Sequence, residues 1–144
     1  RQHQLGYCAG ADNLIELMPH LVRGPDLSFT SWTQRPEGTA DTDAISKVVP
    51  ALVAEVLSES NSRSEMSQKL KDYFFAGVRR VWLIDPRART AEVFTGPDEA
   101  TAIPADGALT GGDVLPGFEL PLAALFVDLP PAPAPAKKAR GRKK

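Results

Sequence analysis

Three polar residues stand out in this sequence because hydrophobic packing alone does not explain them: Asp26, Glu55 and Lys69. Two carboxylates and a lysine at one edge of a sheet would form a recognisable chemical set. Carboxylate oxygens are hard ligands of the kind that hold Mg²⁺, which keeps several waters and engages phosphate oxygens. The metal acidifies a bound water, and a lysine can orient that water or offset negative charge in the transition state.

Glu55 is the most unusual of the three. It lies within "ALVAEVLS" (51–58), a run that predicts a buried strand. Burying an unpaired carboxylate is costly, so Glu55 must have either a partner or a function. The structural alternative is an ion pair with an arginine, for example Arg23 or Arg79.

The other two residues each have a common structural alternative. Asp26 follows Pro25 at the start of an expected strand, where a lone aspartate is usually a turn or strand-start residue. Lys69 lies about 40° outside the apolar arc of the expected helix, beside Tyr73, whereas Lys71 lies about 60° beyond the opposite edge. We therefore expect Lys69 to lean along the sheet and Lys71 to face solvent. A snorkelling flank lysine is the alternative for Lys69.

The elements that must position these residues follow from local patterns. Alternation predicts strands at 13–17 and 26–32, and a strand at 79–85 forms a hairpin with 90–95 through the turn "DPRAR". Ser62 and Glu65 have capping-box spacing, which predicts a helix from about 63 to 76 that Gly77 ends. We expect an edge strand at 100–107 because it contains Pro104, a short helix at 121–126, and a long mobile loop at 34–50.

The order strand, strand, helix, strand, strand implies a mixed β-sheet with one helical crossover. That is an α/β or α+β arrangement rather than a doubly wound one. The length of 144 residues suits one domain. No membrane span, secretory signal, P-loop, GxGxxG or HExxH motif is visible. Two histidines and one cysteine are too few for a zinc site, and the single cysteine fits a reducing cytoplasm.

Charge and composition separate a body from a tail. The tail 137–144, "KKARGRKK", holds six of the 17 Lys and Arg residues and no acid, so residues 1–136 carry 11 basic against 18 acidic residues, a net charge of −7. An acidic body is a poor general DNA-binding surface. "PPAPAPA" (130–136) is typical of an extended linker. We therefore expect a folded unit over 1–128, followed by a linker and basic disordered tail over 129–144.

Four segments in order resemble one known family: "RGPDLSF" (23–29), "LVAEVLSESN" (52–61), "KLKDYFFAGVRRVWLID" (69–85) and "LPGFELPLAALF" (115–126). They resemble the Uma family of restriction endonuclease-type proteins, in the PD-(D/E)XK nuclease superfamily. The resemblance covers residues 5 to about 127 and implies a restriction-endonuclease-like core. It also implies that Asp26 and Glu55 bind the metal.

The sequence departs from that pattern at two places. The superfamily's lysine normally stands two residues after the second acid, where this chain has Leu57. In this family the lysine is in a "K-L-x-x-Y" segment on the next helix, which matches Lys69, Leu70 and Tyr73. Family members also begin with a helix and hairpin bearing a "YELIDGEL"-like segment that residues 1–25 do not match. The chain therefore resembles a member truncated at its N-terminus.

These observations predict a Mg²⁺-dependent (or Mn²⁺-dependent) endonuclease that cleaves DNA. Asp26 and Glu55 would hold the metal, and Lys69 would position the attacking water. We expect a cytoplasmic location, DNA as substrate, no membrane partner, and a homodimer as a candidate assembly. The alternative is a non-catalytic DNA- or protein-binding module on a nuclease scaffold, and the acidic body favours it. Proximity of the Asp26 and Glu55 carboxylates, with no arginine on Glu55, would favour the nuclease.

Overall fold

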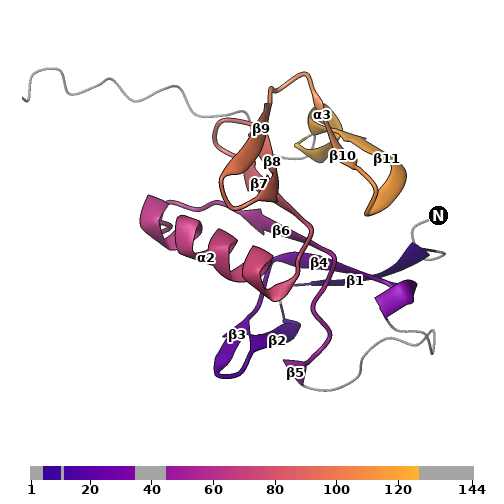
Figure 1. Cartoon of the computed structure of the whole chain (residues 1–144). Coiled ribbons are helices and arrows are strands. Elements are labelled where there is room, and N and C mark those ends of the chain that lie inside the picture. The colour runs from indigo at the N-terminus through magenta and orange to yellow at the C-terminus, as the bar shows by residue number, and fades with distance from the viewer. Residues whose placement is uncertain (1–4, 11, 35–44, 127–144) are drawn as a thin grey trace, which may run out of the picture.

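The computed structural model describes residues 5–10, 12–34 and 45–126, which form a strand-rich mixed α+β fold around one long helix (Figure 1). The predicted tail and linker, the boundary near residue 128 and most of the predicted loop at 34–50 lie outside these residues. The elements in chain order are β1 Gly6–Gly10, β2 Leu14–Met18, β3 Leu21–Arg23, β4 Leu27–Ser31, the 3₁₀ helix η1 Trp32–Gln34, β5 Ile45–Ser46, β6 Leu52–Val56, α2 Arg63–Ala76, β7 Arg80–Asp85, β8 Thr90–Gly96, β9 Glu99–Ile103, β10 Ala108–Gly111, β11 Leu115–Pro121 and α3 Leu122–Leu125.

The main sheet has six strands in the order β1-β4-β6-β7-β8-β9. Strands β6 and β7 pair in parallel, and every other neighbouring pair in this sheet is antiparallel. Helix α2 connects the two parallel strands and covers one face of the sheet (Figure 1). The predicted mixed sheet with one helical crossover is thereby confirmed.

Alternate residues of β6 feed two separate cores, because successive side chains of a strand point to opposite faces. Leu52 and Ala54 pack on the face that β10, β11 and α3 cover. Val53 packs on the α2 face, together with Leu70 and Tyr73 of the helix. Glu55 follows Val53 on this face and therefore points at the helix.

Helix α2 begins and ends where its local sequence predicts. The Ser62 side chain accepts from the Glu65 backbone N–H, and the Glu65 side chain accepts from the Ser62 N–H, so the capping box is complete. Gly77 closes the helix in the left-handed region with φ 117°. Met66, Leu70 and Tyr73 form its buried face, as the helical period predicts.

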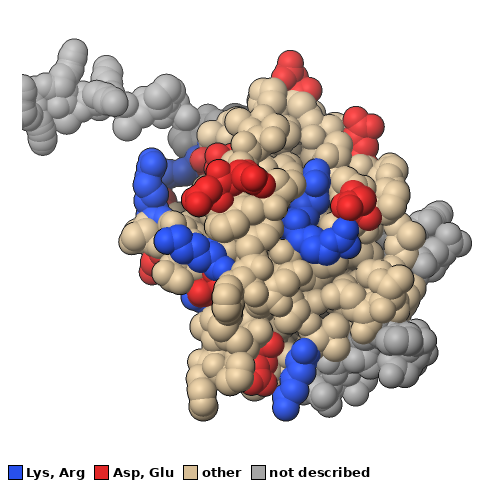
Figure 2. All heavy atoms as spheres, in the orientation of Figure 1, with Lys and Arg blue, Asp and Glu red and all other residues tan. Residues whose placement is uncertain are grey.

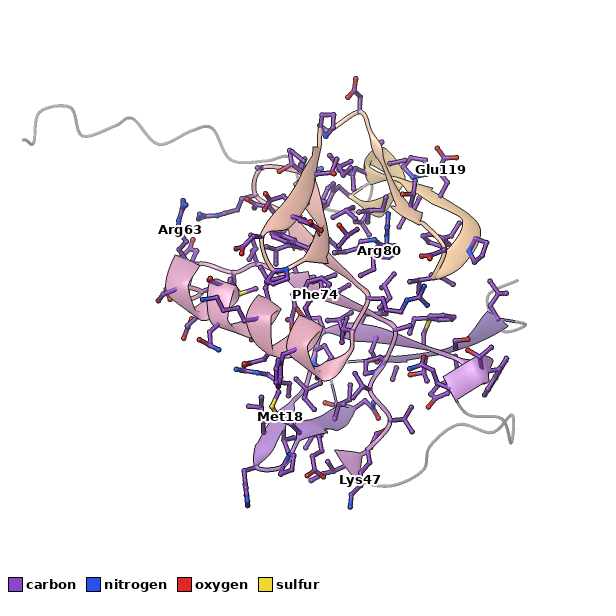
Figure 3. All side chains as sticks on the ribbon, in the orientation of Figure 1. Met18, Lys47, Arg63, Phe74, Arg80 and Glu119 are labelled. Carbon is purple, nitrogen blue, oxygen red and sulfur yellow. The ribbon has the colours of Figure 1, made fainter. Side chains whose placement is uncertain are left out.

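Two small sheets flank the main sheet, in the order β3-β2-β5 and as the pair β10-β11. Figure 3 shows Met18 of β2 where the first small sheet meets the helix, and Met18 and Phe74 of α2 both pack against the same core. On the other side, Arg80 of β7 donates from Nε to the Thr110 carbonyl of β10 at 3.0 Å. Both flanking sheets are thus fixed to the elements that position Glu55.

Several predicted boundaries were wrong. Trp32 belongs to η1 and not to the preceding strand, which ends at Ser31. Strands β1, β3, β5, β10 and β11 were not predicted, because these segments are short or interrupted by glycine and depend on distant pairing partners. The predicted edge strand is β9, which ends before Pro104 and is the outermost strand of the main sheet. No helix among the described residues is long and apolar enough to cross a membrane.

Candidate active site

Glu55 is a buried acid between the sheet and the helix. It is 5% exposed and occupies the next-to-last position of β6, which ends at Val56. The apolar residues around it, which drive β6 into the sheet, leave no solvent to stabilise its charge. Neighbouring side chains must therefore supply that stabilisation.

Helix α2 supplies both partners of Glu55. The Tyr73 hydroxyl donates a short hydrogen bond to Oε2 of Glu55. The Lys69 ammonium lies 3.6 Å from Oε1. Lys69 and Tyr73 are four residues apart and so lie on the same side of the helix.

The arginines proposed as alternative partners of Glu55 pair elsewhere. Arg23 bonds to Asp72 at 2.7 Å, and Arg79 bonds to Asp113 at 3.0 Å. The structural alternative for Glu55, an ion pair with Arg23 or Arg79, is therefore contradicted. Each arginine instead meets an acid that lies on a more accessible part of the surface, where an ion pair costs less desolvation.

Asp26 reaches the same end of the sheet from β4. It is exposed, and its Oδ2 accepts the backbone N–H of Val56, the residue after Glu55, at 2.7 Å. The pairing of β4 with β6 extends to Leu27 and Ala54, the residues next to Asp26 and Glu55. Asp26 therefore lies beside the end of β6, near enough for its charge to act on Glu55.

The electrostatics of the site are dominated by burial. Burial raises the pKa of Glu55, the Tyr73 hydrogen bond and the Lys69 charge oppose that shift, and the Asp26 charge adds to it. Burial and the neighbouring Glu55 charge also raise the pKa of Tyr73. The Tyr73 hydroxyl therefore stays protonated and remains a hydrogen-bond donor throughout the neutral range.

Lys69 and Lys71 differ as the helical wheel predicts. Lys69 is half-buried against Glu55, whereas Lys71 is exposed. The contacts of two further residues, Tyr73 and Arg23, were not predicted. Tyr73 lies on the buried arc of the helix, so its sequence signal is that of an ordinary core residue. Arg23, three residues before Asp26, has an Nε–H that is buried without a hydrogen-bond partner among the described residues.

The donor set fits a hydrated divalent cation better than a cage of protein ligands. Among the described residues no group of three or more His, Cys, Asp or Glu side chains is placed to hold a metal ion. Asp26 and Glu55 alone offer two hard carboxylates. Mg²⁺ is usually held by one or two carboxylates together with waters and substrate phosphates, which is the arrangement that this pair could complete.

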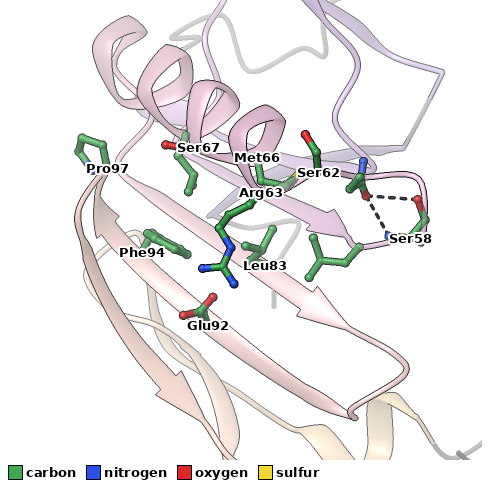
Figure 4. Close-up of a pocket in the computed structure, with 12 residues that line it drawn as sticks. Ser58, Ser62, Arg63, Met66, Ser67, Leu83, Glu92, Phe94 and Pro97 are labelled. Atoms are coloured by element: carbon green, nitrogen blue, oxygen red, sulfur yellow. Dashed lines mark hydrogen bonds between the residues drawn. The ribbon is translucent and has the colours of Figure 1, made fainter. Parts of the chain in front are cut away.

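Two hollows border the site without containing the whole of it. A cleft of about 520 Å³ between α2 and β8 includes Leu57 and Ser58 but none of the three predicted site residues. Figure 4 shows Arg63 of α2 and Glu92 of β8 facing one another in this cleft. A second, largely apolar hollow of about 380 Å³ lies on the other face of the sheet, and Asp26 stands at its border. Asp26 is thus accessible at the end of the sheet, whereas Glu55 is buried and lines neither hollow.

Comparisons with known proteins show the family and the fold of the chain. The family model Uma2, described as "Putative restriction endonuclease", matches residues 1–123. No curated protein matches the chain. Among solved structures, a "putative nuclease belonging to DUF820" from Anabaena variabilis has a TM-score of 0.72 at 20% sequence identity, over 85% of this chain and 69% of that chain. At this identity the likeness shows a shared fold.

Proposed function

The chain belongs to the Uma2 family, and from this premise we propose that it is a divalent-cation-dependent endonuclease that cleaves phosphodiester bonds in DNA. Asp26 and Glu55 would hold Mg²⁺ or Mn²⁺, and Lys69 would position the attacking water. The observation that carries this proposal is the buried Glu55 carboxylate, which the Lys69 ammonium meets at 3.6 Å and next to which Asp26 bonds to the Val56 N–H.

Each residue contributes a distinct part of the chemistry. Glu55 brings a negative charge that the fold keeps in place at an electrostatic cost, as is typical of functional sites. Asp26 adds a second, accessible carboxylate. The bound cation would lower the pKa of a coordinated water and offset charge on the phosphate.

Lys69 can serve the same reaction from the helix. Its ammonium has three donors and no acceptor, so it can donate to a water or to a phosphate oxygen while keeping its contact with Glu55. A fixed positive charge also favours the more negative transition state over the ground state. Lys71 faces solvent, and no comparable contact joins it to the other described residues.

A second candidate function is supported by charge. Residues 1–136 carry a net charge of −7, and Figure 2 shows basic side chains interspersed with acidic ones on the visible face rather than gathered in one patch. Such a surface supplies little nonspecific attraction to phosphate. A non-catalytic binding module on the nuclease fold is the function that this observation favours. The predicted cytoplasmic location and homodimer stay predictions.

A cleavage assay on the purified protein separates the two functions. We expect supercoiled and linear DNA to be cut with Mg²⁺ or Mn²⁺ and not with EDTA. Glu55→Gln and Lys69→Met should each reduce the rate at least about 100-fold, because the first removes a charged ligand of the cation and the second removes the ammonium that positions the attacking water. Lys71→Met is the matched control and should cut as the wild type does. Cleavage by Glu55→Gln at the wild-type rate would refute the assignment, and metal-independent binding without cleavage would favour the binding module.

A further inference from the structure

The Tyr73 hydroxyl is a polar group deep in an otherwise apolar part of the molecule. Tyr73 is 1% exposed, and its ring packs in the core between α2 and the sheet. A phenylalanine would fill the same space with no polar atom to satisfy. The hydroxyl requires a hydrogen-bond partner at this depth, and its partner is Oε2 of Glu55.

The two oxygens of Glu55 have different neighbours. Tyr73 occupies Oε2, and the Lys69 ammonium faces Oε1 at 3.6 Å. Rotation about the last side-chain torsion of a glutamate is soft, so the carboxylate plane has little orientation of its own. The hydroxyl bond selects one orientation of that plane and directs Oε1 away from Tyr73.

The position of the hydroxyl is itself fixed relative to the sheet. Asp72, the residue before Tyr73, bonds to Arg23 at the end of β3 at 2.7 Å and accepts from Gln68 one turn earlier in α2 at 3.0 Å. These bonds tie the helix to the chain segment that leads into Asp26. The helix residue next to Tyr73 is therefore bonded to the strand that precedes Asp26.

We propose that Tyr73 is a positioning residue for Glu55. Its hydroxyl occupies Oε2 of the carboxylate, so that Oε1 is presented to the cation and to Lys69. This inference rests on the proposed function for the identity of the cation site. It assigns to the hydroxyl a role that core packing alone does not require.

Metal affinity tests the inference without relying on cleavage. Tyr73→Phe should weaken Mn²⁺ binding, followed by electron paramagnetic resonance of the free ion, roughly 10- to 100-fold, as expected when a ligand loses its orienting hydrogen bond. Tyr7→Phe is the matched control, because Tyr7 lies on β1, two strands from β6, and packs against Trp32. It should bind Mn²⁺ as the wild type does. Circular dichroism of each variant shows that the fold is kept.

A second measurement keeps Tyr73 and its hydroxyl in place. The chain has two tyrosines, so 3-fluorotyrosine incorporated into the Tyr7→Phe protein labels position 73 alone. We expect its ¹⁹F resonance to shift in a saturable manner as Mg²⁺ is added. The same titration in a protein that also carries Glu55→Gln should leave the resonance unmoved.

The outcomes distinguish this inference from the proposed function. Wild-type Mn²⁺ affinity in Tyr73→Phe, or an unmoved resonance in the labelled protein, overturns the positioning role and leaves the nuclease proposal standing. Weakened metal binding in Tyr73→Phe, with no DNA cleavage by the wild type, supports the positioning role and refutes the nuclease. Absence of metal binding by the wild type overturns both.

Discussion

Asp26 contributes a hydrogen bond to stability and a charge to the candidate site, and two substitutions distinguish these contributions. Its Oδ2 accepts the Val56 N–H at 2.7 Å, and its charge faces Glu55. Asp26→Asn keeps a side-chain oxygen that can accept the Val56 N–H and loses the charge. Asp26→Ala loses both. Each variant removes the Asp26 charge, which adds to the effect of burial on the pKa of Glu55, so that contribution cancels when the two variants are compared.

The expected difference in stability between Asp26→Ala and Asp26→Asn follows from the exposure of the hydrogen bond between Asp26 and Val56. A typical intramolecular hydrogen bond contributes about 1 kcal/mol to stability, and because Asp26 and Val56 are both exposed, water replaces the lost acceptor in the alanine variant. We therefore expect Asp26→Ala to lower the free energy of unfolding by about 1 kcal/mol relative to Asp26→Asn. For a domain of this size that corresponds to about 4 °C in the melting temperature.

Thermal unfolding by circular dichroism and the DNA cleavage assay together test this reasoning. Both variants should lose cleavage to the same extent, because both lack the carboxylate, while only the alanine variant melts early. Equal melting temperatures would show that the bond to Val56 adds no stability. Wild-type cleavage by Asp26→Asn would remove Asp26 from the metal site.

Two further predictions concern stability. Burial raises the pKa of Glu55 from its ordinary value of 4.5, so the stability that the neutral carboxyl gives the folded state is lost as the pH rises through the folded pKa. The melting temperature of Glu55→Gln relative to that of the wild type should therefore increase between pH 4 and pH 8. A difference that is constant with pH would contradict the argument that Glu55 is a buried acid. Gly77 ends α2 at φ 117°, and a methyl group added there would meet none of the surrounding side chains or strands within 4 Å. Gly77→Ala should therefore lower the free energy of unfolding, measured in urea, by about 1 kcal/mol through backbone strain alone. Gly10→Ala, in a strand with equally open space, is the control, and an equal loss there would refute the strain argument.

Local signals predicted the parts of the fold that local interactions determine. Ser62, Glu65 and Gly77 act within one or two turns of the helix, so their spacing was sufficient to place both ends of α2. Strands β10 and β11 were missed because their pairing includes a register shift between Thr110 and Gly111, and Arg80 of a distant strand satisfies the Thr110 carbonyl. Such strands are determined by contacts that no short pattern records.

The same distinction applies to the candidate site. Glu55 was identified because a charge in an apolar strand is costly wherever the chain folds. Lys69 followed from helical geometry. Tyr73 was missed because the sequence does not reveal which polar group a buried hydroxyl will meet, and that depends on how the helix rests on the sheet. Arg23 was named only as an alternative partner of Glu55, and its actual partner, Asp72 on the helix, could not be predicted for the same reason.

Because Lys69 is on a helix, residues of the hydrophobic core help to set its distance from Glu55. An acid and a lysine two residues apart on one strand are separated by backbone geometry alone, about 7 Å along the chain. Here the 3.6 Å between Lys69 and Glu55 spans two layers of structure, and its value depends on how deeply Met66 and Leu70 seat the helix on the sheet. Substitutions at those two core positions would alter the reach of the lysine without touching substrate. Selection for activity would therefore extend into the hydrophobic core, and tolerance to mutation there should be lower than burial alone predicts.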